Sequence, residues 1–84
     1  MRRVRLTHEA IKQLRHFESK TQHRIEEALR YLAANPLEGQ LLKGRFQKYR
    51  VRLYRIWPYR ILYRVLGQDR LEVETIEHRK DIYW

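Results

Sequence analysis

Residues 49–65 read YRVRLYRIWPYRILYRV, and they carry the clearest structural signal in this chain of 84 residues. Arginine alternates there with apolar and aromatic residues. Because successive side chains on a strand point to opposite faces, this alternation is typical of a strand with one face in the core and one face outside. The first half of the segment is expected to place Tyr49, Val51 and Leu53 on one face and Arg50 and Arg52 on the other.

The second half of the segment repeats the pattern. Tyr59, Ile61, Tyr63 and Val65 would share the core face, opposite Arg60 and Arg64. From Gly39 to Gln68 there are eight Lys or Arg and no Asp or Glu. If the two strands pair, their guanidinium groups stand together on one side of the sheet, where like charges destabilise one another. An anionic partner explains such a face, and a phosphate backbone is the first choice.

The N-terminal half predicts a short strand and two helices. Val4 and Leu6 alternate with arginines in the strand, and Thr7 is a suitable N-cap for a helix over residues 8–18. A second helix is predicted over 21–34, with Ser19 and Gln22 at the spacing of a capping box. Its apolar residues have the i, i+3, i+4, i+7 spacing of a core-facing stripe: Ile25, Ala28, Leu29, Leu32 and Ala33.

The C-terminal half predicts three strands, over 46–55, 59–66 and 70–77, separated by turns at Trp57-Pro58 and at residues 67–69. The order is β-α-α-β-β-β. This order predicts an α+β fold in which two N-terminal helices pack on one face of an antiparallel sheet. At 84 residues, the whole of 1–84 is expected to form a single domain.

The composition limits the class of protein. A formal net charge of +9 and a pI near 10.4 are typical of a nucleic-acid binder, although an acidic protein or an anionic membrane surface would also suit them. There is no Cys, and His8, His16 and His23 lack metal-ligand spacing, so we expect no metal and no cofactor. No apolar run is long enough to span a bilayer, and no apolar core follows the basic start of the chain. We therefore expect a cytoplasmic protein.

Four segments together resemble the RelE/ParE superfamily of toxins from type II toxin–antitoxin systems. They are Leu42-Lys43-Gly44, Tyr49-Arg50-Val51-Arg52, the second strand 59–65, and the C-terminal run of residues 76–83, IEHRKDIY. The element order and length also match, so the resemblance covers nearly the whole chain. It implies one of two activities. The RelE branch of the superfamily cleaves messenger RNA in the ribosomal A site, whereas the ParE branch shares the fold and inhibits DNA gyrase without a nuclease site.

The resemblance to the RelE branch implies specific roles. Arg60 would bind the scissile phosphate, Arg79 and Tyr83 would be its C-terminal catalytic pair, and Arg50 and Arg52 would be its basic pair on the preceding strand. Arg52 would share in catalysis as well as in RNA binding. Further RNA contacts are expected from nearby cations: Lys43, Arg45 and Lys48.

Cleavage of RNA needs no metal, because the ribose 2′-OH is the nucleophile. The enzyme must align that hydroxyl, remove its proton, stabilise the phosphorane and protonate the leaving oxygen. Arginine suits phosphate binding but not general-base work, since it stays protonated. His78 is therefore a candidate acid or base, with a structural role as the alternative, and Tyr83 could stack on a base, orient the 2′-OH or simply pack.

Three functions follow from this sequence. The leading one is a metal-independent endoribonuclease toxin, an mRNA interferase that depends on the ribosome and is held by a cognate antitoxin. The alternative is a non-catalytic gyrase inhibitor of the ParE type. The third is a basic binding module without catalysis. The combination of Arg60, Arg79 and Tyr83 favours the nuclease.

Overall fold

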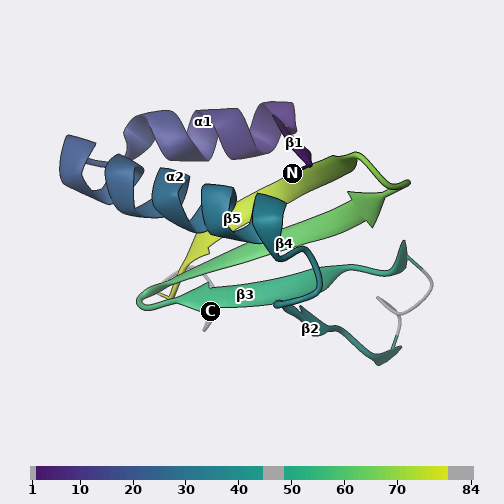
Figure 1. Ribbon diagram of the computed structural model, residues 1–84. Helices are drawn as coiled ribbons and strands as arrows, with labels where there is room; N and C mark the ends of the chain where they lie inside the picture. Colours follow the sequence, from purple (N-terminus) through teal and green to yellow (C-terminus); the bar gives the residue numbers. More distant parts are fainter. Residues whose placement is uncertain (1, 45–48, 80–84) are drawn as a thin grey trace.

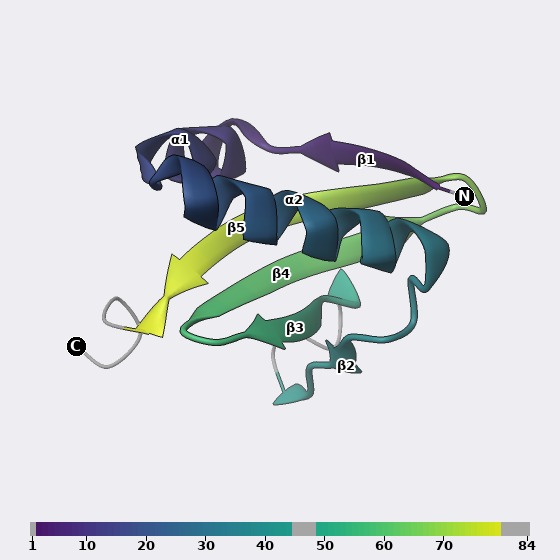
Figure 2. The ribbon, with the colours of Figure 1, turned by 60° about the vertical axis from the view of Figure 1, so that its left-hand side comes forward.

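The computed structural model describes residues 2–44 and 49–79. It contains β1 (Arg3–Leu6), α1 (His8–His16), α2 (Ser19–Ala34), β2 (Gln40–Leu41), β3 (Arg52–Ile56), β4 (Tyr59–Leu66) and β5 (Arg70–His78). The strands form one sheet in the order β1-β5-β4-β3-β2, which can be followed in Figure 2. Both helices lie on the same face of this sheet (Figure 1), so the predicted α+β fold is confirmed.

The sheet differs from the prediction in one pairing. β1 runs parallel to β5, whereas the other three strand pairs are antiparallel, so the sheet is mixed. A parallel neighbour requires a long connection, and here everything from α1 to β4 separates the two strands. β1 therefore occupies one edge of the sheet and β2 the other.

The segment before β4 also differs from the prediction. β2 has only two residues, too few to show any periodicity, and no strand was predicted at its position. The strand predicted over 46–55 is β3, which begins only at Arg52. Arg50 has φ +54°, in the left-handed region, which interrupts an extended strand. Residues 45–48 of the predicted strand lie outside the described residues.

The helices follow the sequence closely. Thr7 caps α1, since its Oγ1 accepts a hydrogen bond from the Ala10 N–H at 3.2 Å. The predicted capping box of α2 is wrong, because the helix already begins at Ser19, and Gln22 instead donates to the Phe17 carbonyl at 2.9 Å. The whole predicted stripe of α2 is buried: Ile25, Ala28, Leu29, Leu32 and Ala33.

The core lies between the helices and the sheet. The buried residues of the sheet that face the helices are Ile61, Tyr63, Leu71, Val73 and Ile76. Tyr63 is fully buried, and its hydroxyl donates to the Pro36 carbonyl at 2.7 Å and accepts from the Gly39 N–H at 2.9 Å. These two bonds attach the connection between α2 and β2 to the centre of the sheet.

Candidate nucleic-acid interface

The register of β3 and β4 decides which arginines share a face. Residues directly opposite each other in an antiparallel pair point the same way. Arg52 pairs with Tyr63, so it lies on the helix face. Arg55 pairs with Arg60, and Leu53 with Leu62, on the face that points away from the helices, which we call the open face.

The position of Arg52 corrects the prediction. Arg52 donates to the Gly39 carbonyl at 2.7 Å and to the Leu37 carbonyl at 3.4 Å, so its guanidinium fixes the connection that follows α2. It does not stand beside Arg60. The alternation of arginine with apolar residues is interrupted at Leu53-Tyr54, where two apolar residues are adjacent. Tyr54, and not Leu53, packs against the core beneath the helices.

A row of three charged residues crosses the open face. Arg55, Arg60 and Glu77 lie directly opposite one another on β3, β4 and β5. Arg60 Nη2 lies 3.3 Å from Glu77 Oε1, while Arg55 is exposed. Cβ atoms of such opposite pairs are about 4.5–5.5 Å apart, so the two arginines repel each other. One carboxylate faces two guanidinium groups, and the row keeps a positive charge.

The turn between β3 and β4 brings a further cation to this end of the sheet. Arg79 N–H donates to the Pro58 carbonyl at 2.8 Å, and the Arg79 guanidinium carbon lies 4.9 Å from the centre of the Trp57 ring. On the helix side, Arg24 donates to the Trp57 carbonyl at 2.9 Å. We call Arg55, Trp57, Arg60 and Arg79 the turn cluster. It consists of three cations and an exposed aromatic ring at one end of the sheet.

The other end of the open face has the opposite charge balance. Arg64 Nη1 lies 3.7 Å from Glu74, and Glu72 lies directly opposite Arg64. Burial, followed by the hydrogen bond and negative charge of Glu72, raises the pKa of Glu74, although Arg64 lowers it. Two carboxylates thus accompany one arginine here. Of the two ends of the open face, as far as the described residues form it, the turn cluster is the one that favours an anion.

The remaining predicted site residues lie elsewhere. His78 lies opposite Tyr59, and the two rings make an edge contact with centroids 5.1 Å apart on the helix face, away from Arg60. Arg50 and Lys43 are exposed near the far end of β3. Three predicted residues lie outside the described residues: Arg45, Lys48 and Tyr83.

Tyr49 also departs from the prediction. It was expected on the core face, but its side chain is 54% exposed and it lies outside β3. Its carbonyl accepts a hydrogen bond from Arg64 Nε at 3.1 Å. The segment that precedes β3 therefore stays close to β4 at the end of the sheet remote from the turn cluster.

Sequence reasoning missed Arg55, which the structure places directly opposite Arg60. The signal was present in the sequence. A two-residue turn at Trp57-Pro58 pairs residues that are equally far from it, so counting outward from the turn matches Arg55 with Arg60. The more regular alternation upstream, which includes Arg52, concealed this pairing.

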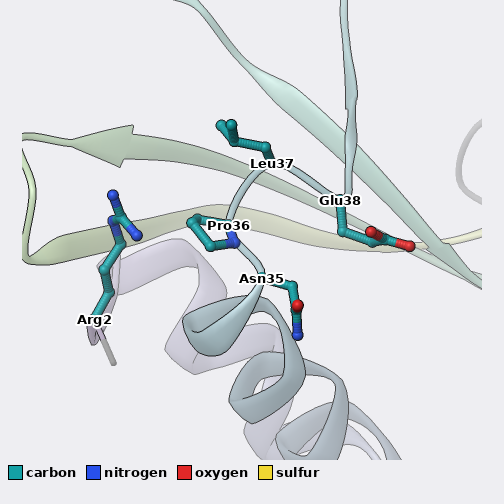
Figure 3. Close-up of a pocket in the computed structure, with 5 residues that line it drawn as sticks. All are labelled: Arg2, Asn35, Pro36, Leu37 and Glu38. Carbon is teal, nitrogen blue, oxygen red and sulfur yellow. The ribbon is translucent and has the colours of Figure 1, made fainter.

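A separate cavity lies at the opposite end of the sheet, on the helix side. It has a volume of about 430 Å³ and is lined by Arg2, Asn35, Pro36, Leu37 and Glu38, as Figure 3 shows.

Within residues 2–44 and 49–79, no group of three or more His, Asp or Glu side chains could hold a metal ion. In the same part of the chain, no helix is long and apolar enough to cross a membrane.

Solved structures of bacterial toxins share this fold. The RelBE2 toxin–antitoxin complex of Mycobacterium tuberculosis contains a chain that is 25% identical, with a TM-score of 0.80, over 90% of this chain and 95% of that one. The intact RelBE complex of E. coli matches with 17% identity and a TM-score of 0.76, over 93% of this chain and 96% of that one. The isolated E. coli RelE toxin matches with 14% identity and a TM-score of 0.75, over 93% of this chain and 84% of that one.

The sequence assigns the family. Residues 4–83 match the family described as ParE toxin of type II toxin-antitoxin system, parDE. The match spans almost the whole chain, so this protein belongs to that toxin family and is a toxin of a type II toxin–antitoxin system. No curated protein sequence matches it.

Proposed function

We propose that this toxin stops translation by cutting messenger RNA in the ribosomal A site, with the turn cluster holding the scissile phosphate. The observation that carries the proposal is the Arg55–Arg60 pair, directly opposite each other on the open face with Glu77 as their one neighbour in the row. The likeness to a RelBE2 complex over 90% of the chain supports the same choice.

Arginine is suited to the charge stabilisation that RNA cleavage requires. Attack by the ribose 2′-OH forms a new P–O bond, breaks the bond to the 5′ oxygen and passes through a phosphorane with extra negative charge. Guanidinium groups of Arg55 and Arg60 would bind the non-bridging oxygens, and Arg79 would supply further positive charge at the same end of the sheet. Loss of one such preorganised donor typically costs on the order of 100-fold or more in rate.

A phosphate that binds Arg60 must first displace the carboxylate of Glu77. This carboxylate neutralises Arg60 in the free toxin, and both side chains are about one-third exposed, at 30% and 32%. A pair this exposed contributes only about 0–1 kcal/mol, so a phosphate can displace the carboxylate at little cost. Proton transfer is assigned to Tyr83 or to groups of the ribosome, because His78 lies on the other face.

The openness of the site supports dependence on the ribosome. The turn cluster lies on an open sheet surface, and a free RNA strand is not held there with its 2′-OH in line with the phosphorus. Alignment of the reacting atoms accounts for a large part of the barrier. The ribosome would supply it by fixing the message in the A site. A cognate antitoxin is the expected protein partner, and the net charge of +9 favours an acidic one.

The second candidate is inhibition of DNA gyrase. The family description, which names the ParE toxin, and the engagement of Arg60 by Glu77 favour this reading. In this case the turn cluster would bind protein or DNA without cleaving anything.

One experiment separates the two functions. The wild-type toxin and the Arg60→Ala variant are added to a translation extract with a defined message, and cleavage is mapped by primer extension. We expect cuts at A-site codons that weaken about 100-fold or more in the variant. Intact messages, together with loss of gyrase supercoiling in a parallel assay, would overturn the nuclease proposal in favour of gyrase inhibition.

A further inference from the structure

Trp57 is exposed in a turn that is otherwise firmly held. Its side chain is 64% exposed, although a large aromatic residue normally buries most of its surface. A loose turn does not explain the exposure. The Trp57 carbonyl accepts a bond from Arg24 at 2.9 Å, and the next carbonyl, that of Pro58, accepts one from Arg79 at 2.8 Å. The backbone is therefore tied to α2 on one side and to the end of β5 on the other.

The ring of Trp57 contacts one cation, and two more arginines lie on the strands that its turn connects. The Arg79 guanidinium carbon lies 4.9 Å from the ring centre, which is within the range of a cation–π contact. Arg55 and Arg60 lie on the two strands that this turn connects. Proteins that hold single-stranded nucleic acid combine cations for the phosphates with an exposed aromatic ring for a base, and this end of the sheet has both.

We propose that Trp57 is a base-stacking residue: its ring holds an unpaired base of the RNA next to the phosphate bound by Arg55 and Arg60. This inference rests on the proposed function and specifies how the RNA is recognised. Arg79 covers part of the ring, and the exposed remainder receives the base. The contact requires an unpaired nucleotide, because a base in a duplex has no free face. Stacking of this kind is tolerant of base identity, so it contributes to binding more than to sequence preference.

The direct test uses the fluorescence of Trp57. The chain has two tryptophans, so a Trp84→Phe variant leaves Trp57 as the only one. It is titrated at low salt with a short single-stranded RNA, and separately with an oligomer of equal length whose sugars carry no bases. Labelled forms of both report binding by anisotropy. Because cleavage is proposed to need the ribosome, the free RNA stays intact during the titration.

We expect the RNA to quench Trp57, and the base-free oligomer to bind through its phosphates with far less quenching. Equal quenching by the two oligomers, RNA binding without quenching, or no binding of the RNA would each overturn the inference.

A second arm measures cleavage in the translation extract at limiting toxin. Trp57→Ala is expected to lower cleavage about 5- to 150-fold, the loss typical for one stacked base, while Trp57→Phe retains most of it. Wild-type cleavage in Trp57→Ala would contradict the stacking role and leave the nuclease proposal standing. Absence of cleavage by the wild-type toxin would instead remove the nuclease proposal, and the fluorescence result would still decide whether Trp57 stacks.

Discussion

The hydroxyl of Tyr63 is expected to stabilise the folded state through two hydrogen bonds. It donates to the Pro36 carbonyl at 2.7 Å and accepts from the Gly39 N–H at 2.9 Å, inside a side chain with no exposed surface. Tyr63→Phe removes both bonds and fills the same space with the ring. The Gly39 residue is itself buried, so its N–H is left without an acceptor.

The expected cost comes from that unsatisfied donor. A buried backbone group that loses its partner costs about 1–3 kcal/mol. For a domain of this size each kcal/mol lowers the melting temperature by about 4–8 °C, so a loss near 2 kcal/mol corresponds to a fall of about 8–16 °C. Urea unfolding followed by circular dichroism should show a lower midpoint with an unchanged slope, because the native surface stays the same.

Tyr54→Phe is the matched control. It removes a hydroxyl from the neighbouring strand on the same face, where the Tyr54 ring packs at 6.1 Å from Tyr31, and it should change stability by less than about 0.5 kcal/mol. If Tyr63→Phe is as stable as Tyr54→Phe, the two bonds of the Tyr63 hydroxyl do not hold the connection between α2 and β2.

Three further predictions concern charge and packing. Glu77→Gln frees the arginine beside it, so RNA binding should strengthen in an anisotropy titration; weaker binding would mean that the carboxylate is needed. The folded-state pKa of Glu74 is raised by burial and by Glu72, so the folded state loses stability as pH rises through that pKa. Glu74→Gln should therefore raise the melting temperature at pH 7 and lose this advantage toward pH 4, and an advantage that persists at pH 4 would contradict the assignment. In Gly39→Ala the new Cβ would lie 2.5 Å from the Tyr63 hydroxyl oxygen, and overpacking of this kind should cost about 1–3 kcal/mol in urea unfolding, whereas an unchanged midpoint would show that the ring can move.

The helical half of the fold was predictable because its signals are local. The apolar residues from Ile25 to Ala33 have the spacing of one buried helix face. The limits of β4 were predicted as observed because Tyr59, Ile61, Tyr63 and Val65 recur at every second position between two turn signals. The pairing of β1 with β5 could not be predicted, because it joins residues far apart in the sequence and leaves no periodic pattern.

The site was predicted less well, and the reason is physical. Leu53 and Tyr54 are both apolar, and the structure buries Leu53 to 4% exposure on the open face while Tyr54 packs toward the helices. Because β3 has apolar residues on both faces, its sequence does not determine which set of alternate side chains faces the helices. Only the cross-strand partner decides, and it places Arg55, not Arg52, beside Arg60.

The proposed function requires that the Arg55–Arg60 pair on the open face binds the scissile phosphate. Comparison of Arg55→Ala with Arg52→Ala tests it most directly, because the two arginines are three residues apart on one strand and lie on opposite faces. Both variants are assayed for A-site cleavage by primer extension, at a temperature where circular dichroism shows each to be folded. We expect a loss of about 100-fold or more for Arg55→Ala and nearly full activity for Arg52→Ala. The reverse result would contradict the proposed function.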